Sequence, residues 1–398
     1  MHSFSMESLN PFLIQYMAEK MKAAVLTAPG RLELLDVSMP RAAADQVLVR
    51  TTAVGICGTD FHIYGGHVNY NRDAEGNPIP LGARPQILGH EITGVIEEVG
   101  RDVKDLKRGD RVILDQGLTC LSQRIQPVCE FCASGDSHQC LNFKEHGITG
   151  VPGGFAQYIA ISGMNAIRID GDLPPTAAAL AEPLGCILHA VDATERATAR
   201  YTFAGERPIR NILIFGAGPA GLLFLQYFRN VRHFDGPIFV ADLNPAKLKL
   251  AAAFGGIPLH SANSELAKEL VERTHGEKIH LIVEASGAGA AFRLLPTLLR
   301  KQGTLVLYGH GHEGVDMSLL NYLQFIEPTL ICPNSASGGF DSDGRPITYR
   351  IAMKHLVSGC IKVEPIVTDR CNLDTLPRVF EQEFRRPSFI KAVVLTKS

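Results

Sequence analysis

Residues 211–230 read NILIFGAGPAGLLFLQYFRN, which is an apolar strand, a glycine-rich turn and the start of an apolar helix. The turn fits the pattern G-x-G-x-x-G, with its residues at Gly216, Gly218, Pro219, Ala220 and Gly221. Glycines at this spacing allow a tight turn, close approach of the backbone to a pyrophosphate and close packing of helix on strand. The helix N-terminus then offers free amide groups to the phosphates. The stretch therefore predicts a dinucleotide-binding unit.

The alternation of strand and helix continues beyond this motif. Residues 236–256, 279–287 and 304–310 contain further apolar strand-like runs, and helical patterns separate them. Strands that alternate with helices predict βαβ units and a parallel sheet. Residues 21–115 instead contain short alternating runs punctuated by turn residues, which is typical of a compact β-rich domain. We therefore expect an α/β domain that is inserted late in a β-rich one.

An acidic residue ends the second strand of this pattern. Asp242 follows Gly221 by about twenty residues, where a carboxylate accepts hydrogen bonds from the adenosine ribose hydroxyls of a dinucleotide. A carboxylate there repels a 2′-phosphate, and the next residues supply no arginine to hold one. Lys247 is close enough in sequence to reach the same ribose. The sequence favours NAD over NADP, although Asp242 also suits the start of a helix with Pro245 in its first turn.

Composition limits the classes of partner. The chain has 398 residues, of which 45% are hydrophobic and 20% charged, so we expect a globular protein of two domains. A net charge of −2 without basic runs gives no support for a nucleic-acid partner. No apolar run approaches the ~20 residues that span a bilayer. Residues 1–20 lack the features of a secretion signal, and we interpret them as an N-terminal extension of a cytoplasmic protein.

Four of the nine cysteines are close in sequence, at Cys120, Cys129, Cys132 and Cys140. In a reducing compartment, clustered cysteines bind metal more often than they form disulfides. Structural zinc takes four ligands in a closed tetrahedron and does not require them to be adjacent in sequence. We predict a structural zinc site in which Cys120 closes the tetrahedron from a stretched first arm. A site with three cysteines and His138, or a cysteine cluster that is empty of metal or oxidised, is the alternative.

A second group of metal-binding residue types is spread over three motifs. GICGTDFH contains Cys57, GHEITG contains His90 and Glu91, and LAEPLGC contains Glu182. Thiolate, imidazole and carboxylate ligands with one open position suit a catalytic zinc. A single residue of these types is more commonly part of a core or a helix cap. The hypothesis of a catalytic zinc therefore depends on all of them occurring together.

The ordered motifs CGTD-x-H, GHE-x-x-G-x-I-x-x-V-G, C-x2-C-x7-C, AEPL and GAGPAG resemble those of the zinc-dependent medium-chain alcohol dehydrogenases. The polyol (sorbitol-like) and threonine 3-dehydrogenase branch is the most similar. The resemblance implies an α/β fold with a GroES-like catalytic domain at 21–186 and 328–398 and a Rossmann NAD-binding domain at 187–327. It also implies a homo-oligomer, either a dimer or a tetramer.

The resemblance implies roles for the residues of these motifs. Cys57 and His90 are the expected zinc ligands. Glu91 and Glu182 both remain candidates for a carboxylate ligand, since one can bind directly and the other through water or in exchange with substrate. A carboxylate in place of a second thiolate makes the site harder, which suits a chelating, polyhydroxylated substrate.

The implied reaction moves a hydride from a secondary alcohol to NAD. Zinc makes the alcohol hydroxyl more acidic. Thr59 accepts the proton, which passes through a nicotinamide ribose hydroxyl to His62 and solvent. The alternative roles are turn formation for Thr59 and a surface position for His62.

Two departures from the family pattern concern the substrate. The loop between Cys57 and His90 is longer than usual and is expected to border the active-site mouth. No arginine occurs between residues 301 and 344, where sorbitol-type enzymes carry one that contacts substrate. We therefore expect a polyol, cyclitol, sugar or sugar acid other than sorbitol, with amino-alcohol oxidation of the threonine 3-dehydrogenase type as the alternative.

Two other classes of protein fit the sequence less well than a zinc-dependent dehydrogenase does. A zinc-free, crystallin-like member of the fold would lack the Cys57, His90 and glutamate set. A zinc-finger-type module that binds nucleic acid through residues 120–140 would carry basic residues in that stretch, and it has no basic run.

Overall fold

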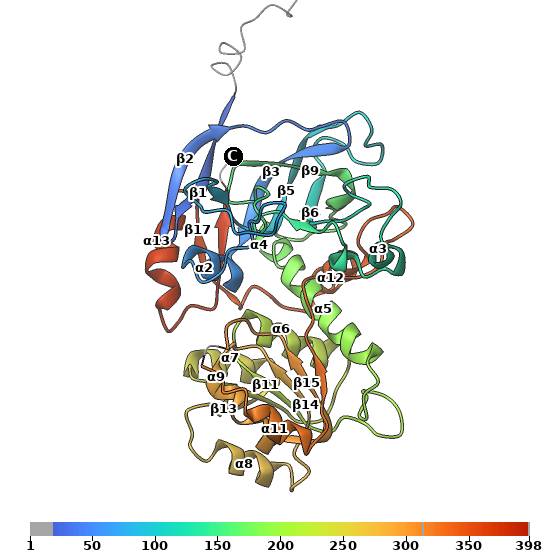
Figure 1. Ribbon diagram of the computed structural model, residues 1–398, viewed down its shortest axis with the longest axis vertical. Coiled ribbons are helices and arrows are strands. Elements are labelled where there is room, and N and C mark those ends of the chain that lie inside the picture. Colours follow the sequence, from blue (N-terminus) through green and yellow to red (C-terminus); the bar gives the residue numbers. More distant parts are fainter. Residues whose placement is uncertain (1–18, 313, 397–398) are drawn as a thin grey trace, which may run out of the picture.

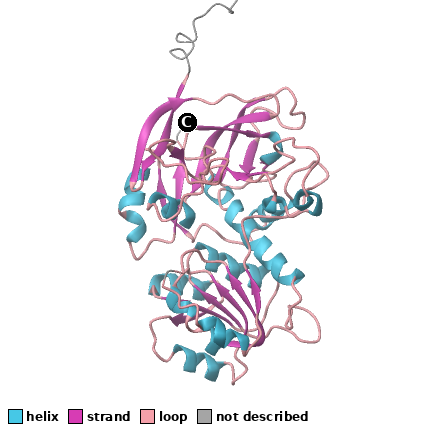
Figure 2. Cartoon of the chain, in the orientation of Figure 1, coloured by secondary structure: helices cyan, strands magenta, loops and turns pink. Residues whose placement is uncertain are grey.

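The computed structural model describes residues 19–312 and 314–396. Two halves are stacked along the long axis of the molecule (Figure 1). Strands dominate the upper half, and helices surround a single sheet in the lower half (Figure 2). Residues 1–18 of the expected N-terminal extension lie outside the described residues. Within the described ranges, no helix is long and apolar enough to cross a membrane.

The lower half is built on a parallel sheet of six strands in the order β13-β12-β11-β14-β15-β16. The strands are β11 (Ile212–Phe215), β12 (Ile238–Asp242), β13 (Ile257–His260), β14 (Ile279–Glu284), β15 (Leu299–Leu307) and β16 (Thr329–Ile331). All residues of β11 and β14 are buried, as is typical of parallel strands covered on both faces. The parallel sheet predicted from the alternation of strand and helix is confirmed.

Helices cover this sheet, and successive strand residues face opposite cores. The helices are α6 (Pro219–Gln226), which continues into a π-helical turn (Tyr227–Val231), α7 (Pro245–Ala253), α8 (Leu266–Arg273), α9 (Gly289–Phe292), α10 (Leu295–Leu298) and α11 (Leu319–Gln324). Ile212 and Ile214 of β11 pack in one cluster, whereas Leu213 and Phe215 pack in another. The two-residue period of a strand explains this division.

The upper half contains three sheets. One has seven strands in the order β10-β6-β5-β3-β18-β17, with β9 also paired to β3; another has the order β2-β1-β4, and β7 pairs with β8. The strands are β1 (Lys20–Ala28), β2 (Arg31–Ser38), β3 (Gln46–Gly55), β4 (Gln86–Ile87), β5 (Glu91–Val99), β6 (Arg111–Leu114), β7 (Gly117–Leu118), β8 (Lys144–Glu145), β9 (Tyr158–Ser162), β10 (Ala166–Arg168), β17 (Val367–Cys371) and β18 (Lys391–Leu395). The predicted β-rich half is confirmed, and β18 completes it from the far end of the chain.

One long helix connects the halves. It is α5 (Ala181–Arg196). The remaining α-helices are α2 (Gly58–Tyr64), α3 (Glu130–Ser134), α4 (Pro175–Ala178), α12 (Ile347–Val357) and α13 (Leu376–Glu381). Helix α5 packs on α12, where Gly185 leaves room for Ala336 and Thr348. Most residues of α5 are buried, which suits a helix between two bodies. The exact limits of the two domains stay a prediction.

Candidate active site

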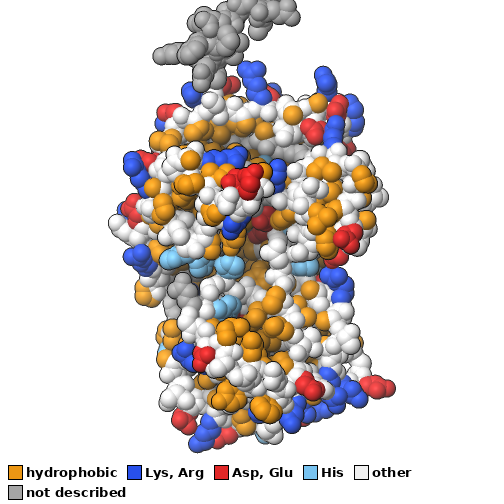
Figure 3. Space-filling model, in the orientation of Figure 1, with side chains coloured by type: hydrophobic (Ala, Val, Ile, Leu, Met, Phe, Trp, Pro, Cys, Tyr) orange, Lys and Arg blue, Asp and Glu red, His pale blue; other side chains and the backbone are white. Residues whose placement is uncertain are grey.

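Histidine side chains gather where the two halves of the molecule meet (Figure 3). The N-terminal turn of α2, the start of β5 and the first turn of α5 carry the predicted ligand candidates. Cys57 is the N-cap residue of α2, and Glu91 is the first residue of β5. Cys57 and Glu182 are 125 positions apart in sequence, yet the ends of α2, β5 and α5 bring them to the same junction.

Cys57, His90 and Glu91 form a group whose potential ligand atoms lie within 4.8 Å of one another. His90 and Glu91 are buried, at 3% and 0% exposure. Glu91 Oε2 has no hydrogen-bond partner among the described residues, although it is buried. A buried carboxylate oxygen without a donor is costly unless it binds a cation. The donor set and this unpartnered oxygen fit a zinc ion.

Asp60 holds the segments that carry these ligands. Its Oδ2 accepts a hydrogen bond from the Cys57 amide at 2.8 Å, and its Oδ1 accepts one from the Gly89 amide at 3.2 Å. Asp60 Oδ1 also lies 3.4 Å from His90 Nδ1. Burial acts to lower the pKa of His90, but Asp60 and Cys57 raise it well above its usual value. Asp60 therefore orients its neighbours, as carboxylates behind metal-binding histidines commonly do.

A buried lysine balances the charge of Glu91. Lys391 of β18 is 3% exposed and donates a hydrogen bond to Glu91 Oε1. Burial acts to lower the pKa of Lys391, whereas the Glu91 carboxylate raises it. One oxygen of Glu91 is thus paired with Lys391, and the other has no hydrogen-bond partner among the described residues.

Glu182 lies beside this group but outside the set of mutually close ligand atoms. Its Oε1 accepts hydrogen bonds from Gln116 Nε2 at 3.1 Å and from the Cys186 thiol at 3.3 Å. Burial raises the pKa of Glu182 to about 7, and the negative charge of Glu91 adds to this effect while His90 opposes it. The arrangement brings Cys57, His90 and Glu91 together and leaves Glu182 engaged by neighbouring side chains.

The four clustered cysteines come together in the upper half. The sulfur atoms of Cys120, Cys129, Cys132 and Cys140 all lie within 4.8 Å of one another. All four are free thiols, and the Sγ atoms of Cys120 and Cys140 are 3.5 Å apart. Amide hydrogen bonds from the backbone of Cys132 and Leu141 lower the pKa of Cys129 to about 6, which favours the thiolate form that binds zinc. The donor set fits a closed four-cysteine zinc site.

The stretched arm reaches this cluster through a turn. Residues 120–124 form turns, and the Ile125 amide donates a hydrogen bond to the Cys120 carbonyl at 2.8 Å. Cys120 is fully buried in the cluster although it is the most distant cysteine in sequence. The ring of His138, the alternative fourth ligand, contacts Asp115 and Ser335 at 3.1 and 2.7 Å instead.

The glycine turn of the lower half is shaped for close approach of a ligand. Gly216 has φ 95°, in the region that favours glycine. A Cβ atom on Gly221 would lie 1.9 Å from the Gly216 carbonyl oxygen, whereas a Cβ on Gly218 would meet open space. Gly218 is the N-cap residue of α6, and Pro219 occupies its first turn, with Ala220 next. These are the features that a pyrophosphate site requires.

Asp242 lies at the end of β12 and is tied to this turn. Its Oδ2 accepts a hydrogen bond from the Ala217 amide at 2.7 Å, and its Oδ1 accepts one from the Asn244 amide at 2.8 Å. Asn244 caps α7 by accepting hydrogen bonds from the amides of Ala246 and Lys247. Asp242 is thus held where the glycine turn and α7 begin, and Lys247 is half-buried in the first turn of α7.

Comparisons with known proteins decide the family. Residues 43–171 match the alcohol dehydrogenase GroES-like domain, and residues 219–334 match the zinc-binding dehydrogenase domain. The chain is 30% identical over 370 residues to an L-threonine 3-dehydrogenase of Thermococcus kodakarensis, which covers 92% of this chain and 95% of the relative. It belongs to the zinc-dependent medium-chain alcohol dehydrogenases. The predicted family and enzyme class are confirmed.

Further relatives and solved structures agree with this assignment. An L-threonine 3-dehydrogenase of Anaeromyxobacter dehalogenans is 32% identical over 288 residues, covering 71% of this chain and 75% of the relative. The structure of galactitol-1-phosphate dehydrogenase from Escherichia coli superposes with a TM-score of 0.76 at 23% identity, covering 94% of this chain and all of the other. The structure of L-idonate 5-dehydrogenase from Escherichia coli superposes with a TM-score of 0.74 at 20% identity, covering 95% of this chain and 99% of the other. These structures confirm the fold of a medium-chain dehydrogenase.

In this dehydrogenase the predicted proton relay begins next to Cys57. Thr59 Oγ1 lies 3.8 Å from Cys57 Sγ, and His62 follows one turn later on α2. The His62 ring is 5.9 Å from that of His310, which follows β15 in the lower half. His310 Nε2 in turn lies 2.9 Å from the hydroxyl of Tyr70 in the long loop. The loop therefore reaches the junction of the halves, as the sequence predicts.

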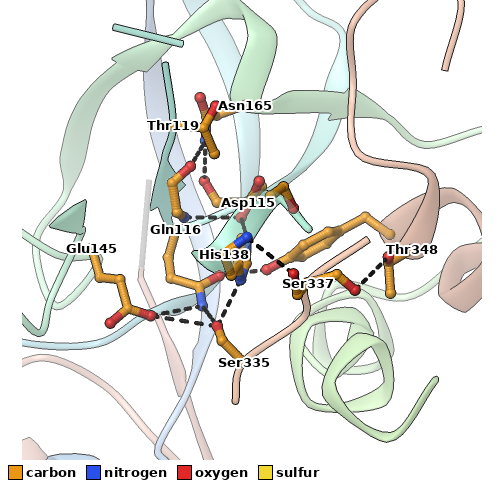
Figure 4. Close-up of polar contacts among 12 residues, drawn as sticks. Asp115, Gln116, Thr119, His138, Glu145, Asn165, Ser335, Ser337 and Thr348 are labelled. Atoms are coloured by element: carbon orange, nitrogen blue, oxygen red, sulfur yellow. Dashed lines mark hydrogen bonds and ion pairs between the residues drawn. The ribbon is translucent and has the colours of Figure 1, made fainter. Parts of the chain in front are cut away.

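The structure also places residues at this site that the sequence does not indicate. Gln116 Nε2 donates a hydrogen bond to Glu182 Oε1 at 3.1 Å. It also donates one to Ser335 Oγ at 3.1 Å and lies 3.5 Å from Glu145 Oε1 (Figure 4). Tyr349 fixes the Gln116 amide by donating to its Oε1. No motif marks these residues, because their proximity comes from the pairing of β7 with β8 and from a loop that returns after β16.

Proposed function

We propose that this dehydrogenase oxidises a secondary alcohol to a ketone, with zinc at Cys57, His90 and Glu91 and with NAD at the glycine turn. The observation that carries the proposal is the buried thiol, imidazole and carboxylate group at the junction of the two halves, with one carboxylate oxygen unpartnered among the described residues. Zinc bound there supplies a Lewis acid that makes the alcohol hydroxyl more acidic. The second zinc belongs to the four-cysteine cluster, where it stabilises the fold.

The nucleotide half supports NAD as the cofactor. Bound NAD supplies the acceptor for the hydride. The amides at the start of α6 face its phosphates, and Asp242 accepts hydrogen bonds from the adenosine ribose. We assign Gly216, Gly218, Pro219, Ala220, Gly221, Asp242 and Lys247 to this site. A carboxylate at position 242 repels a 2′-phosphate, so NADP binds more weakly.

Thr59 and His62 move the proton. Thr59 Oγ1 would accept the proton of the alcohol and give up its own hydroxyl proton. With NAD bound, that proton would pass through a nicotinamide ribose hydroxyl to the His62 ring, which releases one to solvent. Asp60 holds the N-terminal turn of α2 so that Thr59 stays next to Cys57. Glu182 is the candidate that exchanges with substrate, since Gln116 and Cys186 hold it beside the group rather than within it.

Replacing Thr59 tests the relay. Thr59→Val keeps the shape of the side chain but removes the hydroxyl, so kcat falls by about 100-fold while the KM for NAD stays unchanged. Thr59→Ser restores most of the rate because it restores the hydroxyl. Steady-state kinetics over a range of pH measure both variants. Full activity of Thr59→Val would remove the residue from the relay.

The substrate class follows from what the site lacks. No arginine occurs between residues 301 and 344, so the contact that sorbitol-type enzymes use is absent from the sequence. A polyol, cyclitol, sugar or sugar acid that chelates zinc through neighbouring oxygens suits the carboxylate-containing ligand set. Oxidation of an amino alcohol is the second candidate, favoured by the similarity to L-threonine 3-dehydrogenases.

A screen of NAD reduction over alcohols tests the proposed function. The panel contains polyols, cyclitols, sugar acids, L-threonine and simple amino alcohols, each tested with NAD and with NADP. We expect NAD-dependent oxidation of at least one alcohol and about two zinc ions per chain by metal analysis. Zinc-free protein, or purified zinc-loaded protein that oxidises none of the panel, would contradict the proposal.

We also propose that the enzyme is a homo-oligomer, as a dimer or a tetramer built from dimers, in the cytoplasm. Strand β16 is an edge of the parallel sheet, and the side chains of Tyr322, Phe325 and Leu330 beside or on it are 60%, 79% and 49% exposed. An exposed edge strand flanked by large apolar side chains is a surface that proteins normally cover, and a second copy covers it symmetrically. Fractionation of expressing cells tests the location.

Light scattering tests the oligomer. The expected mass of the wild type is a multiple of the 43.2 kDa chain. Phe325→Glu places a charge in the proposed interface and shifts the mass towards that of one chain, whereas an exposed apolar control, Leu141→Glu, leaves it unchanged. A wild type that stays monomeric at micromolar concentration would rule the interface out.

A further inference from the structure

Glu145 is a carboxylate at the junction that neither the zinc group nor the nucleotide site uses. It is the last residue of β8, which pairs with β7, so its backbone is fixed opposite Gly117. Its side chain lies at the edge of the network in Figure 4, and its contacts are confined to Oε1. The second oxygen has no hydrogen bond with any residue in the described part of the chain. The Glu145 carboxylate is thus held in place through Oε1, and its other oxygen is available to hydrogen-bond a ligand.

The contacts of Glu145 do not balance its charge. Gln116 Nε2 and Ser335 Oγ approach Oε1 at 3.5 and 3.4 Å, which is long for hydrogen bonds to a carboxylate. Neither donor is charged, and no lysine, arginine or histidine of the described residues forms an ion pair with Glu145. Burial raises the pKa of Glu145, while the charges of His138 and His90 and the Gln116 hydrogen bond act to lower it. The half-buried carboxylate thus lacks a counter-charge among the described residues, and a cationic group of a bound ligand would supply one.

The position of Glu145 is next to the chemistry. Gln116 Nε2 bridges Glu145 and the zinc-side carboxylate Glu182, at 3.5 and 3.1 Å. Burial raises the pKa of Tyr70 in the long loop, and the nearby charge of Glu145 adds to this effect. Glu145 thus lies one bridging side chain away from Glu182, and we take it to face the part of a substrate beyond its reacting carbon.

The neighbouring backbone is strained in a way that keeps this arrangement. Ser335 has φ 58°, in the left-handed region that a serine rarely adopts. That conformation places its hydroxyl 2.7 Å from His138 Nδ1, 3.1 Å from Gln116 Nε2 and 3.4 Å from Glu145 Oε1. Strain of this kind persists where the surrounding structure fixes it, commonly at functional sites.

We propose that Glu145 is a substrate-recognition residue that binds a protonated amino group on the carbon next to the reacting alcohol. The inference rests on the proposed dehydrogenase function and, of its two substrate candidates, selects the second, as a β-amino alcohol. A neutral polyol can donate hydroxyl hydrogen bonds to Glu145 but leaves its charge unbalanced. A free amino acid would bring a carboxylate as well, and Lys391, the buried cation of the site, is already paired with Glu91.

A matched pair of substrates tests this assignment. 1-Amino-2-propanol and 1,2-propanediol have nearly the same shape, but the first is a cation at neutral pH. In the zinc-loaded wild type with saturating NAD, we expect a kcat/KM at least about tenfold higher for the amino alcohol. Glu145→Gln keeps the size of the side chain and removes its charge, so kcat/KM for the amino alcohol falls by about 10- to 100-fold, mostly through KM. The value for the diol changes by less than about threefold.

Control variants separate recognition from folding. Glu130→Gln removes a charge from an exposed position at the start of α3, in the same half of the molecule. It leaves kcat/KM for both substrates unchanged. Glu145→Asp retains the charge and part of the preference. Zinc content and NAD affinity stay unchanged in Glu145→Gln, and binding of the amine is followed independently by the thermal shift that it causes.

The outcomes distinguish this inference from the proposed function. Equal losses for both substrates in Glu145→Gln, or a wild type that prefers the diol, would overturn the role of Glu145 while leaving the dehydrogenase intact. If no alcohol is oxidised at all, the proposed function fails. In that case the thermal shift still decides, because an amine that stabilises the wild type and Glu145→Gln equally does not bind this carboxylate.

Discussion

Cys57→Ser abolishes alcohol oxidation, with kcat reduced by about 1,000-fold or more, while NAD still binds. The loss follows because Cys57 supplies the thiolate of the group formed with His90 and Glu91, and a serine hydroxyl is a poor zinc ligand at neutral pH. Without the Lewis acid, the alcohol hydroxyl keeps its ordinary acidity and several kcal/mol of stabilisation are lost. Steady-state kinetics with the best substrate of the screen measure the effect.

A cysteine-to-serine substitution outside both cysteine sites provides the control. Cys332 is exposed and belongs to neither cysteine site, so Cys332→Ser retains wild-type kinetics and two zinc sites. NAD binding by Cys57→Ser, followed by calorimetry, matches that of the wild type because the glycine turn lies in the other half. A Cys57→Ser enzyme with normal turnover would show that this group is not the catalytic centre.

Cys120→Ser lowers the free energy of unfolding by about 3 kcal/mol or more and releases one zinc ion per chain. Cys120 is fully buried among the other three cysteines, and replacing it leaves an incomplete tetrahedron around the metal. Thermal unfolding and metal analysis of the purified variant measure the two effects. The expected fall in Tm is roughly 5–10 °C for a domain of this size.

The comparison of activity with stability makes this prediction specific. The four-cysteine cluster does not share a ligand with the Cys57 group, so the zinc that remains in Cys120→Ser is the catalytic one and the folded variant keeps most of its kcat at low temperature. A variant that holds both zinc ions with an unchanged Tm would show that Cys120 is not a ligand. Loss of all zinc with rapid aggregation would still agree with a structural role, since activity is then lost together with folding.

Local sequence was sufficient for much of the fold. Gly216, Gly218 and Gly221 define a turn whose geometry depends only on neighbouring residues, and a Cβ at 221 would collide with the Gly216 carbonyl. The buried runs of β11 and β14 are continuous, so their assignment to a parallel sheet needs no tertiary information. Cys57 and His90 follow from motifs of the same local kind.

The remaining features of the site depend on contacts that sequence patterns do not encode. Glu145 and Gln116 meet because β7 pairs with β8, and Ser335 reaches them from the loop after β16. Lys391 approaches Glu91, 300 positions earlier in the sequence, because β18 returns to pair with β3. Neither Glu145 nor Lys391 belongs to a motif, and each reaches its neighbours at the site only once the chain has folded. The choice between Glu91 and Glu182 is of the same kind.

Anomalous diffraction at the zinc absorption edge, from crystals of the full-length enzyme with NAD, tests the central claim most directly. We predict two peaks: one among the four clustered cysteines and one at about 2.0–2.3 Å from Cys57 Sγ, a nitrogen of His90 and a glutamate oxygen. The second peak also shows whether that oxygen comes from Glu91 or Glu182. A fully loaded enzyme without a peak beside Cys57 and His90 would contradict the account.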